Sequence, residues 1–243
     1  MFNHRPNSLN AGSLWGRPFY ILREAWNILN AIAEGKIESG DEKKLNALKG
    51  ETMAVIALCQ FDLTRCFGYP YTKDNGASLG APLIDHLVGT YENPSRSTVA
   101  QAYDFIIETL EEAVTLMSEE KNNGRMNKYA ARALLARVYL YHNDNRKAFD
   151  MAEQLIKDVD ASGSYALYPH EKYVAAWSVE TKFGSESFFE IANSVDDTPG
   201  RDSWGYLLNW YGYQKGFVTQ KYAEQMLADP GDVRGQLLEE NKY

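Results

Sequence analysis

Residues 123–140, NGRMNKYAARALLARVYL, decide the fold class of this chain. From about Asn127 to Tyr141 the side chains are apolar or small on nearly all sides, which is typical of a helix buried between neighbouring helices. The turn at residues 142–145 follows. Beyond it, Ala148, Ala152 and Leu155 fall on one face of a further helix. The stretch therefore predicts two packed helices joined by a short turn.

This helix pair matches much of the tetratricopeptide repeat pattern. Leu135, Tyr139 and Ala148 stand at the required spacings. Small residues let two helices approach closely, while Leu and Tyr fill the groove between them. Arg132 and Ala152 stand where the pattern has Trp and Phe. One such unit alone is also compatible with an ordinary helical hairpin, but the surrounding helices favour a repeat-like stack.

Proline and glycine divide the rest of the chain into helical and irregular zones. Residues 95–168 contain no proline, and apolar residues recur at helical spacing over residues 99–117. Thr98 and Gln101 form a capping-box pattern before that helix. Further helices are expected over residues 14–33, 45–67 and 218–227. An irregular connection is expected over residues 68–95, a short strand at 188–191 and a loop at 193–216.

These patterns predict a mainly α fold. A tetratricopeptide-like scaffold is expected over residues 14–160, and an irregular, loop-rich lobe over residues 161–243.

The composition excludes several classes of protein. A net charge of −8 argues against a nucleic-acid binder, and 13% aromatic residues argue against disorder. The longest apolar run, residues 53–59, is far shorter than the roughly 20 residues that cross a bilayer. The four histidines show no metal-ligand spacing, and no phosphate-binding glycine loop occurs. We therefore expect neither a metal nor a cofactor.

An ordered series of motifs resembles the SusD/RagB family, the surface-exposed nutrient-binding lipoproteins of Bacteroidetes. The strongest motif is residues 123–140, which is close to the family's "gR.tk.AA.ALLARvYLy". Residues 55–57, Val-Ile-Ala, depart from the Arg-Ala that the family usually carries there. The motifs that carry the resemblance lie at residues 14–27, 50–70, 96–113, 123–140, 185–191 and 229–234.

The resemblance implies one SusD-like domain over residues 1–243. It also implies capture of an oligosaccharide or other nutrient, and its delivery to a SusC-like TonB-dependent transporter. The protein would be attached to the extracellular face of the outer membrane through a lipidated N-terminal cysteine. This sequence shows neither a signal peptide nor that cysteine. Family members run beyond residues 229–234, so we expect the C-terminal region to be incomplete relative to the family.

A cluster of aromatic residues between residues 201 and 217 is the best candidate for a glycan site. Sugar rings pack their C–H faces on aromatic planes, and polar neighbours bind the hydroxyl groups. Alternatively, these rings pack the irregular lobe onto the helices. Trp15 is a further candidate, although we expect it to pack at the start of its helix. The predicted site residues are Trp204, Trp210, Tyr206, Tyr211 and Tyr213 for stacking, with Asn209 and Arg201 for polar contacts.

The resemblance, together with the aromatic cluster, favours a non-catalytic glycan-binding protein over two alternatives. The first alternative is a tetratricopeptide-like scaffold that binds another protein. The second is a helical glycosidase, which needs two converging carboxylates. Ser78 lies in a string, residues 76–80, that matches a hydrolase nucleophile elbow. That motif needs a preceding strand and a following helix, which the sequence around it does not predict.

Overall fold

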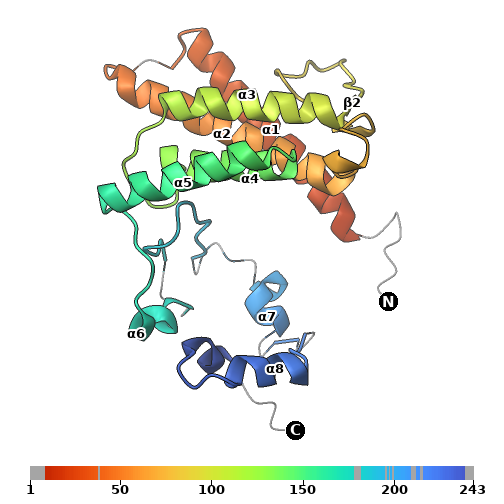
Figure 1. The fold of residues 1–243 in the computed structure, drawn as a ribbon. Coiled ribbons are helices and arrows are strands. Elements are labelled where there is room, and N and C mark those ends of the chain that lie inside the picture. Colours follow the sequence, from red (N-terminus) through yellow and green to blue (C-terminus); the bar gives the residue numbers. More distant parts are fainter. Residues whose placement is uncertain are drawn as a thin grey trace. The chain divides into compact units, whose positions relative to one another are not determined.

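Helices dominate the chain in the computed structural model (Figure 1). The structure describes residues 9–37, 39–177, 182–194, 196, 198, 200–208, 212–213 and 216–238. The chain divides into two compact units between Ser164 and Tyr165. We call them the helical unit and the loop-rich unit. The predicted mainly α fold is confirmed, whereas the assignment of residues 1–243 to a single domain stays a prediction.

The helical unit is a stack in which each helix packs against the next one along the chain (Figure 1). A two-stranded antiparallel sheet, β1 with β2, occupies part of the predicted irregular connection. The helix α1 begins earlier than the sequence predicts and continues through Pro18. The elements are α1 (Leu9–Ala33), α2 (Glu42–Phe67), β1 (Leu79–Pro82), β2 (Arg96–Thr98), α3 (Val99–Leu116), α4 (Lys128–Tyr141) and α5 (Asn145–Ser162), with a 3₁₀ turn at Tyr71–Lys73.

The pair α4–α5 shows what Arg132 contacts at the position where the repeat pattern has tryptophan. The Arg132 side chain is largely buried, and its Nη1 donates to Asp158 Oδ2 at 2.6 Å. This hydrogen bond, supported by a second one from Gln154, lowers the pKa of Asp158. The Tyr139 hydroxyl donates to Glu111 of α3 at 2.6 Å. Buried polar groups therefore find partners across the helix interfaces, which avoids the cost of leaving them unpaired.

Helix starts in this unit are set by side-chain caps. Thr98 and Gln101 form the predicted capping box, with the Gln101 N–H donating to Thr98 Oγ1 at 3.1 Å. Asn127 caps α4 by accepting from the Ala130 N–H at 3.0 Å. Glu51 of α2 accepts the N–H of Met126 at 3.0 Å. These contacts fix where α3 and α4 begin and tie the segment before α4 to α2.

A glycine allows α2 to approach the end of α3. A Cβ atom at Gly50 would lie 2.6 Å from Met117 Cγ and 2.9 Å from the Ala113 carbonyl oxygen. Both distances are well inside van der Waals contact. Gly12 on α1, by contrast, has open space around it.

We predict that Gly50→Ala lowers the free energy of unfolding by about 1–3 kcal/mol, because the added methyl overpacks the α2–α3 contact. The matched substitution Gly12→Ala should leave the stability unchanged or raise it by up to about 1 kcal/mol. Urea unfolding followed by circular dichroism measures both. Equal stability of Gly50→Ala and the unmodified chain would contradict the close approach.

The loop-rich unit contains short helices joined by irregular segments. Its elements are α6 (His170–Tyr173), α7 (Trp204–Leu208) and α8 (Gln220–Leu227), with 3₁₀ turns at Ala175–Trp177, Gly200–Asp202 and Val233–Leu237. Asp232 caps the last turn, and the Arg234 Nε donates to both of its carboxylate oxygens at 2.9 Å. These hydrogen bonds lower the pKa of Asp232 to about 2.

Two sequence expectations in this unit are wrong. Residues 188–191 do not form a strand, and Phe188 packs edge-on against Tyr165 instead, with ring centroids 4.9 Å apart. The described part of this unit offers no other strand for pairing. Residues 193–216 are not all loop, because Ser203 accepts the N–H of Tyr206 at 3.1 Å and starts helix α7.

None of the described helices combines sufficient length with sufficient apolar character to cross a bilayer.

Candidate functional site

The structure brings together two of the predicted glycan-site residues, Tyr206 and Tyr213. Their rings meet edge to face, with centroids 5.0 Å apart, and the Tyr213 N–H donates to the Tyr206 carbonyl at 2.8 Å. Gly212 makes this turn possible, since a Cβ there would collide with the Tyr206 carbonyl oxygen. Tyr213 is 46% exposed.

The other predicted site residues contribute less to this picture. Arg201 is exposed in the turn before α7, and Trp204 is the first residue of that helix. Asn209, Trp210 and Tyr211 lie outside the described residues.

The nucleophile-elbow interpretation of Ser78 finds no support in the local geometry. The Ser78 hydroxyl donates to Asp74, and the residue lies just before strand β1 rather than after a strand. A nucleophile elbow needs the opposite order. A glycosidase needs two converging carboxylates, and one acidic residue of the loop-rich unit, Glu186, accepts the Tyr168 N–H at 2.5 Å and so holds a turn there. Across the described residues, no group of three or more His, Cys, Asp or Glu is placed to hold a metal ion.

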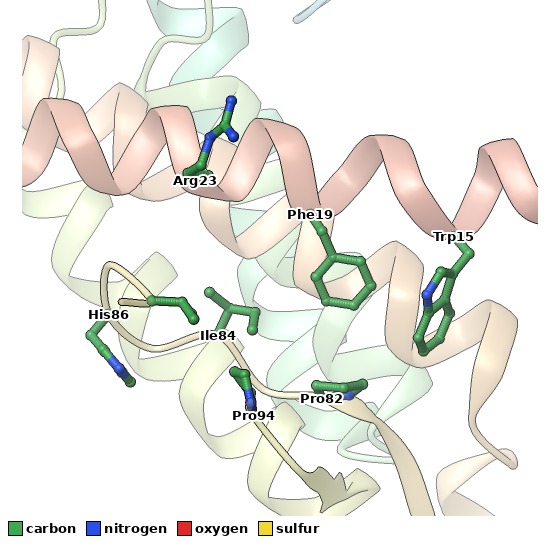
Figure 2. A pocket seen from close by; sticks show the side chains of 8 residues that line it. Trp15, Phe19, Arg23, Pro82, Ile84, His86 and Pro94 are labelled. Atoms are coloured by element: carbon green, nitrogen blue, oxygen red, sulfur yellow. The ribbon is translucent and has the colours of Figure 1, made fainter. Parts of the chain in front are cut away.

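A pocket of about 400 Å³ in the helical unit was not predicted as a site (Figure 2). One wall is helix α1, and the other is the connection that follows β1. Figure 2 shows Trp15 and Phe19 projecting from α1 toward the segment that carries Pro82 and Ile84. The lining residues are Trp15, Phe19, Arg23, Pro82, Ile84, His86, Val88 and Pro94.

The α1 wall presents a partly open aromatic surface. Trp15 packs edge to face on Phe19 and on Phe67 of α2, with centroid separations of 5.1 and 4.7 Å. Its side chain is nevertheless 38% exposed. The expectation that Trp15 packs is thus met, yet the ring also lines the pocket. A spacing of four residues separates Trp15, Phe19 and Arg23. This spacing is the sequence signal that could have placed the three residues on one face of the helix.

The opposite wall is held in place by one fully buried side chain and one partly buried side chain. Gln60 of α2 is fully buried, its amide Nε2 donates to the Pro82 carbonyl at 3.1 Å, and its Oε1 accepts the Ile84 N–H at 3.3 Å. The Trp26 indole of α1 donates to the Ile84 carbonyl at 3.1 Å. Side chains therefore satisfy backbone groups that an irregular buried segment would otherwise leave unpaired.

We predict that Gln60→Met lowers the free energy of unfolding by about 1–3 kcal/mol for each backbone group left unpaired. Methionine has similar length but cannot replace the amide hydrogen bonds. The exposed Gln236→Met is the matched control and should stay within about 0.5 kcal/mol of the unmodified chain. Chemical unfolding of both variants measures the difference, and equal stabilities would show that Gln60 does not hold this wall.

One edge of the pocket is a short loop with charged residues. His86 contacts Asp85 and Glu92, and the second carboxylate oxygen of Glu92 accepts the Gly89 N–H at 3.1 Å. The hydrogen bonds to Asp85 and then Glu92 raise the pKa of His86. The Gly89 N–H, followed by His86, lowers the pKa of Glu92. The pocket thus combines ring faces inside with a charged, hydrogen-bonded edge, as small-molecule sites commonly do.

Comparisons with known proteins identify the family. Residues 4–140 match a SusD-like family that is described as starch-binding and associating with the outer membrane. The chain belongs to the SusD-like family. A comparison with curated proteins gives no match.

Solved structures of SusD-like proteins share this fold. A SusD superfamily protein from Bacteroides vulgatus ATCC 8482 is 96% identical, with a TM-score of 0.94, and the match covers 100% of this chain and 55% of that one. A SusD superfamily protein from Bacteroides thetaiotaomicron VPI-5482 is 34% identical, with a TM-score of 0.82. The match covers 94% of this chain and 50% of that protein. The chain therefore spans about half the length of these solved relatives.

A more distant similarity extends to a laminarin-binding SusD-like protein. It is 24% identical, with a TM-score of 0.59, and the match covers 80% of this chain and 40% of that protein. At this identity the similarity shows the shared fold alone.

Proposed function

We propose that this SusD-like chain binds an oligosaccharide without chemically altering it. The observation that carries the proposal is the Trp15 ring, which is partly exposed inside a pocket of a chain whose family is described as starch-binding. An indole face is well suited to the C–H face of a sugar ring. Arg23 lines one end of the pocket, and its guanidinium pairs with Glu24 on the same helix.

The size of the pocket limits what it holds. A volume of about 400 Å³ lies toward the lower end of the range for small-molecule sites. It accommodates a short part of an oligosaccharide, and the remainder of a longer glycan extends into solvent. Since few contacts of this kind carry most of the binding energy, the Trp15 ring is expected to dominate.

We predict that Trp15→Ala weakens oligosaccharide binding by about tenfold or more, equivalent to about 1.4 kcal/mol. Isothermal titration with maltoheptaose, followed by a panel of other soluble oligosaccharides, measures the effect. Trp177→Ala is the matched control, because Trp177 is 66% exposed and belongs to the loop-rich unit. Circular dichroism checks that Trp15→Ala keeps its fold, and unchanged binding by a folded variant would exclude the pocket.

We also propose the sequence-predicted aromatic set as a second glycan surface. It comprises Trp204, Trp210, Tyr206, Tyr211, Tyr213, Asn209 and Arg201. The exposure of Tyr213 supports this proposal. If the main ligand contact is here, Trp210→Ala abolishes binding in the same titration while Trp15→Ala leaves it intact. The reverse result assigns the ligand to the pocket, and comparable losses in both variants indicate that both surfaces take part.

We further propose that the full-length protein is lipid-anchored at the extracellular face of the outer membrane. There it would deliver its ligand to a SusC-like TonB-dependent transporter. The family's description as associating with the outer membrane supports this placement. The gene should encode an export signal that ends in a lipidation cysteine, with a transporter gene beside it. A gene that encodes no export signal before this sequence would contradict the proposal.

A further inference from the structure

His86 lies between two carboxylates in the loop at the edge of the pocket. Its Nδ1 is 2.6 Å from Asp85 Oδ1, and its Nε2 is 2.8 Å from Glu92 Oε1. Both ring nitrogens are therefore at hydrogen-bonding distance from a carboxylate oxygen.

This arrangement favours a protonated ring. A neutral imidazole carries one N–H, so its other nitrogen can only accept a hydrogen bond. An ionised carboxylate has no proton to offer, and an unprotonated nitrogen at this distance would be repelled by it. Only the imidazolium donates to Asp85 and Glu92 at the same time.

The contacts close a loop that forms part of the pocket wall. Glu92 accepts from His86 through one oxygen and from the Gly89 N–H through the other. His86 and Val88 line the pocket from within this loop, and Pro94 lines it just beyond. A change in the His86–Glu92 contact therefore alters the position of the pocket wall opposite α1.

The other charged group at this pocket comes from α1. Arg23 lines the same pocket, and its guanidinium pairs with Glu24 at 2.8 Å. The charge of Arg23 is thus largely balanced on its own helix, while the charge of His86 is balanced by Asp85 and Glu92.

We propose that residues 85–92 form a proton-dependent clamp, in which imidazolium at His86 holds the pocket edge closed and its deprotonation releases Glu92. A consequence, which rests on the proposed function, is that oligosaccharide binding at the pocket weakens as the pH rises.

The directions of the pKa shifts agree with this geometry. The pKa of His86 is raised above its usual value of about 6.5, so the His86 contribution is fully present below that value and is lost as the pH rises through the raised pKa. The pKa of Glu92 is lowered, so its contribution is lost only when the pH falls through that lower value. The clamp is therefore expected to hold at pH values between the lowered pKa of Glu92 and the raised pKa of His86.

The clamp can be tested without any ligand. An NMR titration follows the His86 ring and the Gly89 amide, with His86→Gln used to assign the ring signal. We expect His86 to titrate above pH 6.5, and the Gly89 amide shift to follow the same midpoint. The double variant Asp85→Asn/Glu92→Gln should return the midpoint to the ordinary value. A His86 midpoint that is the same in both proteins, or a Gly89 amide that does not respond, overturns the proposal.

Binding measurements then separate the clamp from the proposed function. Between the protonated and deprotonated forms, the Kd for the best-binding oligosaccharide of the panel should rise about two- to tenfold, the range that corresponds to one exposed hydrogen bond. His86→Gln should remove this dependence, and His170→Gln, in the other unit, should keep it. If no oligosaccharide binds at any pH, the proposed function fails, while the NMR titration still decides the clamp. A pH-independent Kd in the unmodified protein excludes a role of the clamp in binding.

Discussion

The buried amide of Gln60 is the interaction on which the pocket and its edge depend. An irregular segment can run against a helical core only if its backbone polar groups find partners there. Gln60 satisfies the Pro82 carbonyl and the Ile84 N–H, and Trp26 satisfies the Ile84 carbonyl. With these bonds in place, the apolar side chain of Ile84 joins the core formed by α1 and α2. Three of the residues that follow, His86, Val88 and Pro94, line the pocket opposite α1.

The helices that support this segment also combine close packing with paired polar groups. Gly50 lets α2 approach α3, and Glu51, the next residue, holds the segment that leads into α4. Arg132 and Tyr139 carry polar groups into the interfaces of α4, each with a carboxylate partner on a neighbouring helix. Such groups stabilise one register of the stack, because a shifted register would leave them unpaired. The scaffold is therefore specific in its arrangement as well as apolar in its core.

Local sequence patterns predicted a structural element correctly wherever the residues of that element determine its structure. The helical periodicity predicted α2, α3, α4 and α5 to within a few residues, and the Thr98–Gln101 capping box was correct in detail. The secondary-structure predictions failed where neighbouring residues in the sequence do not determine the local structure. Residues 188–191 have strand-like composition, but a strand needs a partner strand. Helix α7 starts from a single cap at Ser203 within a segment that is otherwise rich in loop residues.

The sequence by itself determined the mainly α fold, the helical stack and the family, because periodicity, caps and ordered motifs are local properties. It also pointed to the aromatic residues around Tyr206 and Tyr213. Only the tertiary structure decided the pocket, since Trp15 and Ile84 are far apart in the chain and meet through the packing of α1 on α2. The charged loop lies between these two cases. Asp85 directly precedes His86 in the sequence, whereas the contact with Glu92 arises only from the turn of the chain between residues 86 and 92.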